Sequence, residues 1–128
     1  MDMAVVHMAT NIISPKVAMK EIVGKGLGTV AIQSLVAGEL VISEKPLIVI
    51  PSWSESELIA VFHKLSCKEQ MDFLSLANSQ HSSMNHIVGV AITNMLPLAE
   101  PGSYGVFKNI SRVNHNCLPN CNHYQVKY

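Results

Sequence analysis

The chain has 128 residues, the size of one domain, which excludes an enzyme with separate cofactor and substrate domains. Hydrophobic residues make up 48% of the chain and charged residues 14%, a composition that predicts a folded protein rather than a disordered one. Nine Lys and Arg balance nine Asp and Glu, so the formal net charge is zero and direct binding of nucleic acid is not expected.

The start of the chain and its cysteines indicate an intracellular protein, nuclear or cytoplasmic. Asp2 stands where a secretory signal carries basic residues, and the apolar run that follows is short. The longest apolar stretches, such as residues 47–51 and 87–92, fall well below the roughly 18 to 20 residues of a membrane span, so no membrane contact is expected. Three cysteines, an odd number, favour reduced thiols over a disulfide framework.

Four segments follow one another along the chain. Residues 1–14 show no clean periodicity and are expected to form an N-terminal lead-in. Residues 15–51 contain short β-branched runs separated by glycine turns, which predicts a β-meander. Residues 52–97 predict a helical insertion, and residues 98–128 return to strand-like sequence. The order of strands, helices and strands indicates an α+β fold.

Three helices are predicted in the helical insertion. Ser54 and Ser66 are each followed by a glutamate three residues later, which is the spacing of a capping box at a helix start. A third helix covers residues 84–96 and must end before Pro97, since proline interrupts a helix. The apolar residues of the second helix that are expected to face inward are Met71, Leu74 and Ala77.

A glycine-rich turn joins the first two strands predicted in residues 15–51. Its sequence is Gly24-Lys25-Gly26-Leu27-Gly28. A dinucleotide-binding loop needs G-x-G-x-x-G leading into a helix, whereas here the third glycine comes one residue early and strand-like residues follow. Glycines at alternate positions instead permit positive φ and let a ligand approach the backbone. A plain hairpin turn is the alternative interpretation.

A dense polar segment extends from Asn109 to Cys121. It holds the only arginine of the chain together with four asparagines, a composition that suits an ordered functional loop. A zinc site is one alternative, with the four candidate ligands His115, Cys117, Cys121 and His123. Their spacing does not match the usual paired-knuckle pattern. A purely structural role, with asparagines in a tight turn and a buried thiol, is the other alternative.

Asn94 is the third candidate for a functional residue. It lies three, four and seven residues after Ala91, Val90 and Ile87, so it projects from an apolar face of the third predicted helix. A buried amide has to be hydrogen-bonded. Its partner is either a backbone group of a neighbouring turn or a ligand.

These segments, in this order, resemble the SET domain, the catalytic module of one large class of protein-lysine methyltransferases. Residues 24–31, followed by Gly38-Glu39, are similar to the family's opening G-x-G-x-x-A strand pair with its G-E turn. Residues 112–120 resemble the family's diagnostic string R-x-x-N-H-x-C-x-P-N, with one residue fewer between the arginine and the first asparagine. Thr93-Asn94 after a helical insertion resembles the arrangement in SET-and-MYND and fungal SET proteins. The resemblance covers about residues 15–128, which would form a partial SET domain.

The resemblance implies a cofactor, a substrate and a set of binding residues. S-adenosylmethionine would lie against the backbone of Lys25, Gly26 and Leu27. The side chains of Asn94 and Asn114 would hold its methionyl end, and Asn114 and His115 would contact the adenine side mainly through main chain. The substrate would be a lysine of a histone or another protein.

The sequence also departs from the family pattern. The family's catalytic tyrosine belongs to a later G-E-E-L-x-x-x-Y string that is absent up to Tyr128, so no catalytic residue is expected within these residues. We therefore expect a C-terminally truncated SET domain, lacking the C-terminal part of the fold, that does not transfer methyl groups. The later cysteine cluster is absent as well, which leaves Cys117 as a lone zinc ligand at most, and bound zinc is not expected. The alternatives are a non-catalytic module that binds protein or cofactor and, more weakly, a small zinc-binding domain.

Overall fold

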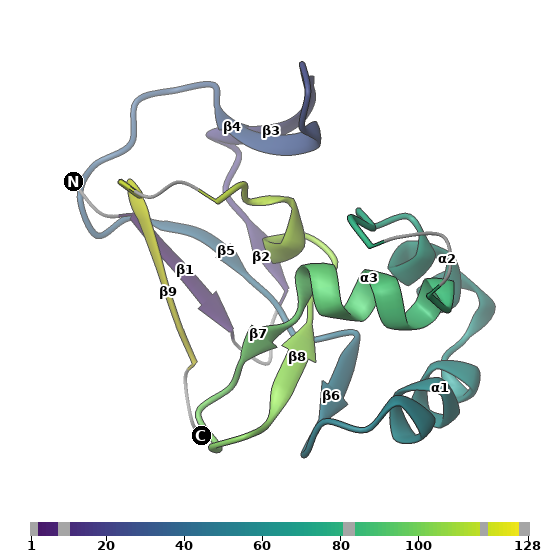
Figure 1. Ribbon diagram of the computed structural model, residues 1–128. Coiled ribbons are helices and arrows are strands. Elements are labelled where there is room, and N and C mark those ends of the chain that lie inside the picture. Colours follow the sequence, from purple (N-terminus) through teal and green to yellow (C-terminus); the bar gives the residue numbers. More distant parts are fainter. Residues whose placement is uncertain (1–2, 8–10, 81–83, 116–117, 126–128) are drawn as a thin grey trace. The chain divides into compact units, whose positions relative to one another are not determined.

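The computed structural model describes residues 3–7, 11–80, 84–115 and 118–125 (Figure 1). The chain divides into two compact units. Unit 1 comprises Met1–Lys45 and Arg112–Tyr128, and unit 2 comprises Pro46–Ser111. Helices and mainly antiparallel sheets occur in separate stretches of the chain, which confirms the predicted α+β class. The boundaries between the four predicted segments, at residues 15, 52 and 98, remain predictions.

Unit 1 contains a four-stranded sheet and a separate two-stranded hairpin. The sheet has the order β2 (Ile12–Ile13), β5 (Leu40–Ser43), β1 (Met3–His7) and β9 (Cys121–Gln125). β1 runs parallel to both of its neighbours, and β2 runs antiparallel to β5. The hairpin pairs β3 (Val17–Ile22) with β4 (Gly26–Ala31) in an antiparallel register from Val17 opposite Ala31 to Ile22 opposite Gly26.

The segment expected to be a lead-in thus contains two strands, β1 and β2. Neither strand shows a periodic pattern long enough to read from the sequence, because each is short and its partners are far away in the chain. The predicted strands near residues 20–32 correspond to the β3–β4 hairpin, and the predicted strand at residues 40–44 corresponds to β5.

Unit 2 contains a three-stranded antiparallel sheet and three helices. The sheet has the order β6 (Ile48–Ile50), β8 (Tyr104–Val106) and β7 (Leu96–Pro97). The helices are α1 (Glu55–Lys64), α2 (Cys67–Leu74) and α3 (His86–Asn94). A short 3-10 helix, η1 (Ile110–Arg112), follows β8. No helix among the described residues is long and apolar enough to cross a membrane.

Local capping explains where the helices of unit 2 begin. Ser54 accepts a hydrogen bond from the backbone N–H three residues on, and Ser66 and Glu69 form a complete capping box. Asn85 caps α3 by accepting from the first turn of that helix. α3 ends at Asn94, before Pro97, as the proline predicts.

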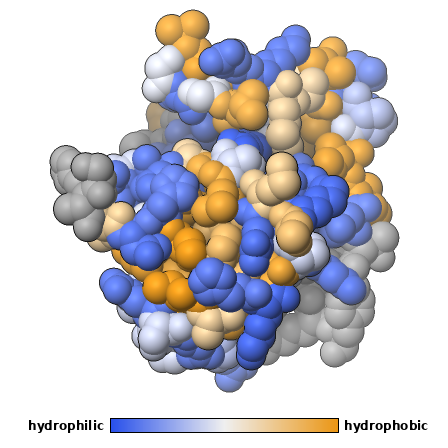
Figure 2. Space-filling view, turned by 90° about the vertical axis from the view of Figure 1, so that its right-hand side faces the viewer, coloured by the Kyte–Doolittle hydropathy of each residue, from blue (hydrophilic) through white to orange (hydrophobic). Residues whose placement is uncertain are grey.

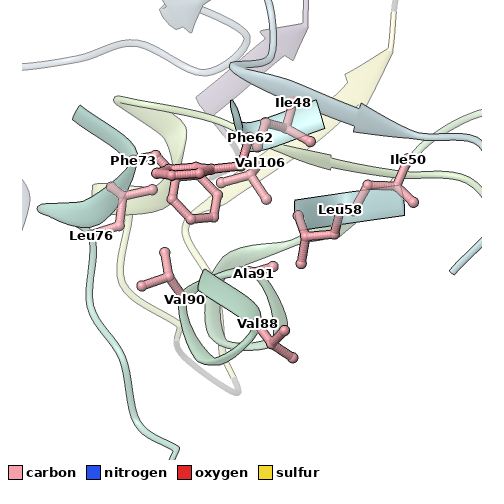
Figure 3. Packing of buried hydrophobic residues seen from close by; sticks show 10 residues of the cluster. All are labelled: Ile48, Ile50, Leu58, Phe62, Phe73, Leu76, Val88, Val90, Ala91 and Val106. Atoms are coloured by element: carbon pink, nitrogen blue, oxygen red, sulfur yellow. The ribbon is translucent and has the colours of Figure 1, made fainter. Parts of the chain in front are cut away.

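The core of unit 2 lies between the helices and the β6–β8 strands (Figure 3). Phe62 of α1 and Phe73 of α2 meet with ring centroids 5.3 Å apart. Met71 of α2 is 71% exposed, whereas Phe73 is completely buried, so the prediction that Met71, Leu74 and Ala77 face inward was wrong. The aromatic contact sets the rotation of this short helix, because a fully buried phenyl ring outweighs the two smaller apolar residues.

Candidate functional site

The tip of the β3–β4 hairpin exposes backbone at the position that the sequence predicts. The Lys25 backbone N–H donates to the Ile22 carbonyl at 2.9 Å and closes the turn. Gly24 and Gly26 have φ of 76° and 70°, in the left-handed region that favours glycine. A Cβ added at either glycine would meet no atom within 4 Å. Residues 24–27 at the tip of the hairpin are exposed, with open space beside both glycines.

Gly28 brings the Asn114 side chain onto the hairpin. A Cβ added at Gly28 would lie 2.6 Å from Asn114 Nδ2 and closer still to Ile22 Cδ1. Since alternate residues of a strand share a face, Ile22 and Gly28 lie on the same side of the hairpin in this register. The Asn114 amide consequently rests against bare backbone. Gly28 of the glycine-rich turn and Asn114 of the polar segment, which are far apart in the sequence, therefore meet within unit 1.

Glu39 links the turn before β5 to Lys16, the residue before β3. Glu39 Oε1 pairs with Lys16 Nζ at 2.6 Å, and Glu39 Oε2 accepts from the Val36 backbone N–H at 2.9 Å. The hydrogen bond from Lys16, followed by that from Val36, holds the pKa of the Glu39 carboxyl below its ordinary value. Gly38 takes the positive φ of 80° that this turn needs. Glu39 therefore has a structural partner rather than a free carboxylate.

Asn94 belongs to unit 2 and is engaged within it. Its Nδ2 donates to the carbonyls of Ala77 at 2.7 Å and Val90 at 2.8 Å. Both amide hydrogens are thereby used, and Oδ1 is left as an acceptor that pairs with none of the described residues. The backbone partners expected for a buried amide are present, and only the carbonyl oxygen is available to a ligand.

The remaining predicted site residues lie in or next to the polar loop. His115 directly follows Asn114 and is exposed. Cys117 falls outside the described residues. Cys121 is half-buried at the start of β9, and His123 is exposed on the same strand. Across residues 3–7, 11–80, 84–115 and 118–125, no group of three or more His, Cys, Asp or Glu side chains is arranged to hold a metal ion.

Sequence reasoning did not identify Ile22 as a neighbour of Asn114. The third glycine of the turn is the signal that was available, because a glycine within a strand often marks a close approach of another group. The sequence also did not connect Asn94 with Ala77, since the two residues are joined only by the folding of the segment before α3.

Comparison with known proteins gives one relationship. Residues of this chain are 31% identical, over 99 positions, with the histone-lysine N-methyltransferase set5 of Schizosaccharomyces pombe (strain 972 / ATCC 24843). This similarity supports a SET-like relationship. The matched region covers 77% of the chain and 30% of the curated relative, so the chain spans about a third of that protein. No protein-family model matches the chain, and no solved structure matches it.

Proposed function

We propose that this chain is the cofactor-binding part of a SET-type protein-lysine N-methyltransferase and that unit 1 binds S-adenosylmethionine. The observation that carries the proposal is the contact of the Asn114 amide with the backbone of Gly28, beside the exposed residues Lys25, Gly26 and Leu27. The similarity to a histone-lysine methyltransferase supports the same assignment.

The chemistry of these groups suits a zwitterionic cofactor. An amide side chain offers both a donor and an acceptor, which an amino-acid end with a carboxylate and an ammonium requires. The exposed residues at the hairpin tip lie where the resemblance implies main-chain contacts with the cofactor. No phosphate has to be neutralised, so a site without clustered lysines is adequate. The face of the molecule drawn in Figure 2 intermixes hydrophilic and hydrophobic residues.

The part proposed for Asn94 is narrower. Because both of its amide hydrogens bind backbone carbonyls, it has only Oδ1 to offer to a ligand. A carbonyl oxygen accepts hydrogen bonds, so a ligand group that binds Asn94 has to be a hydrogen-bond donor.

When bound, S-adenosylmethionine supplies a methyl group on a positively charged sulfur. The proposed acceptor is the side-chain amine of a lysine in a histone or another protein, and the proposed compartment is the nucleus or cytoplasm. Since the ordinary pKa of lysine is about 10.4, that amine has to lose its proton before it reacts. We assign no described residue to this step. Binding and orientation of the cofactor are the roles proposed for this chain.

Calorimetric titration with S-adenosylhomocysteine tests the proposal. Asn114→Ala removes one or two hydrogen bonds to charged groups, each worth about 1.5–3 kcal/mol, so affinity should fall at least tenfold. Asn122→Ala is the matched control, because Asn122 is an exposed asparagine of the same unit, whose Oδ1 accepts a hydrogen bond from the backbone N–H of its neighbour His123. Equal binding by Asn114→Ala and the parent chain would reject the proposed site.

Methyl transfer separates an enzyme from a binding module. The parent chain is incubated with radiolabelled S-adenosylmethionine and mixtures of histone and non-histone proteins. Label on lysine that is lost in Asn114→Ala supports the methyltransferase. Binding of S-adenosylhomocysteine without any transfer would limit the role of this chain to binding the cofactor.

A further inference from the structure

Residues 77–80, here called the 77–80 segment, follow α2 in the chain and lie alongside α3. The Ser79 backbone N–H donates to Thr93 Oγ1 at 3.1 Å, and the Ala77 carbonyl accepts from Asn94 Nδ2 at 2.7 Å. Thr93 and Asn94 are the last two residues of α3. The 77–80 segment is therefore bound to the C-terminal turn of this helix through two neighbouring side chains.

The Thr93 hydroxyl acts both as a donor and as an acceptor. Thr93 Oγ1 donates to the Gly89 carbonyl one turn earlier at 2.7 Å, so its single hydrogen is committed to the helix. Its lone pairs then accept from the Ser79 backbone N–H at 3.1 Å and from the Ser79 hydroxyl at 3.3 Å. Thr93 therefore connects the backbone of α3 with the 77–80 segment through one oxygen atom.

Asn78 makes a second contact with α3. A Cβ added at Gly89 would lie 2.5 Å from Asn78 Oδ1 and 2.7 Å from Asn78 Nδ2, so this amide lies directly on the glycine backbone. Asn78 Oδ1 also accepts from the Gln80 backbone N–H at 3.0 Å, and Asn78 Nδ2 lies 3.1 Å from His86 Nδ1. Gly89 is thus a position of α3 at which a side chain would collide with the 77–80 segment.

These contacts affect the direction in which Asn94 presents Oδ1. Of its two hydrogen-bond acceptors, the Val90 carbonyl belongs to α3 itself, whereas the Ala77 carbonyl belongs to the 77–80 segment. A single hydrogen bond leaves a terminal amide able to turn about χ2, which has broad energy wells, while bonds to two separate carbonyls fix its plane. Oδ1 lies in that plane. Asn94 is therefore oriented by the 77–80 segment as well as by its own helix.

We propose that Thr93 and Asn78 are positioning residues, which hold the 77–80 segment on α3 and thereby orient the Asn94 carbonyl oxygen toward a hydrogen-bond donor of the ligand. This inference rests on the proposed function, in which Asn94 Oδ1 is available to the cofactor. The two residues act through Asn94 and not by touching the ligand. Loss of either contact should therefore weaken binding by no more than removal of the Asn94 side chain does.

Thr93→Val tests the positioning role. Valine keeps the branched shape of threonine but has no hydroxyl, so the Ser79 N–H loses its acceptor. Thr93→Ser is the matched control, because serine keeps the hydroxyl. Nuclear magnetic resonance follows the side-chain amide signals of Asn94, which are assigned by their loss in Asn94→Ala, and calorimetric titration with S-adenosylhomocysteine gives the affinity. Thr93→Val should move these signals and lower affinity about threefold to tenfold, as expected for one neutral hydrogen bond, while Thr93→Ser matches the parent.

Gly89→Ala disturbs the same arrangement from the side of the helix. Alanine is a better helix former than glycine, so α3 itself should keep its stability, whereas the new Cβ displaces the Asn78 amide. The Asn94 signals should again move and the affinity should again fall, with the helical circular dichroism of the parent retained. Asn94 signals that stay in place in both Thr93→Val and Gly89→Ala would overturn the inference.

Double variants show whether the effect passes through Asn94. Thr93→Val should lower affinity no further once Asn94 has become alanine. An equal loss in that background would overturn the positioning role, and parental affinity in Asn94→Ala would overturn it while leaving the site at Asn114 in place. A parent chain that does not bind S-adenosylhomocysteine would refute the proposed function itself, and this inference with it.

Discussion

Gly28→Ala separates folding from cofactor binding at the proposed site. The new Cβ would lie 2.6 Å from Asn114 Nδ2 and closer to Ile22 Cδ1, so both side-chain ends have to move. Moving each costs about 0.5–1.5 kcal/mol, against a gain of about 0.4–1 kcal/mol because alanine restricts the unfolded chain. The net loss of stability should be about 1 kcal/mol. The loss of ligand affinity should be larger than this loss of stability. Each hydrogen bond from Asn114 to a charged ligand group is worth about 1.5–3 kcal/mol, so displacing the amide should lower affinity at least tenfold.

A double-mutant cycle tests this reasoning. Chemical denaturation gives the stability, and titration with S-adenosylhomocysteine gives the affinity, for the parent, Gly28→Ala, Asn114→Ala and the double variant. If Gly28→Ala acts by displacing Asn114, it should weaken binding little further once Asn114 has become alanine. Adding Ile22→Val to Gly28→Ala removes the Cδ1 contact and should restore stability without restoring affinity. Additive losses of affinity in the double variant, or parental affinity in Gly28→Ala, would refute the steric argument.

Two further predictions concern the framework of the two units. Because the Glu39 pKa is lowered by Lys16, its ion pair stabilises the fold above the ordinary carboxyl pKa of 4.5 and is lost as the pH falls through the lower folded value. Thermal unfolding should therefore show Glu39→Gln less stable than the parent near pH 6, and the difference should shrink as the pH falls below 4.5. A difference that does not change with pH would contradict the role of the pair. In unit 2, Phe73→Ala should cost about 3–5 kcal/mol in chemical denaturation, while Met71→Ala changes stability by no more than about 0.5 kcal/mol. Comparable losses would show that α2 faces the core as the sequence alone suggested.

Features that depend on neighbouring residues were predictable from the sequence. The starts of α1 and α2 follow from Ser54 and Ser66, because a cap and the N–H it satisfies lie three residues apart. The hairpin turn follows from glycines that permit positive φ, and the end of α3 follows from Pro97. Asn114 and the glycine-rich turn could be selected as candidate site residues, since one belongs to a segment with four asparagines and the other has glycines at alternate positions.

Tertiary structure decided what depends on distant partners. Within the expected lead-in (residues 1–14), strand β1 forms only because it pairs with β5 and β9, which are remote in the sequence. In α2, Phe73 rather than Met71 faces inward because it packs against the ring of Phe62 on another helix. The approach of Asn114 to Gly28 likewise arises from folding. Backbone dihedrals and caps are set by forces that act over a few residues, whereas strand partners and buried faces are chosen by packing among segments that meet only in the folded chain.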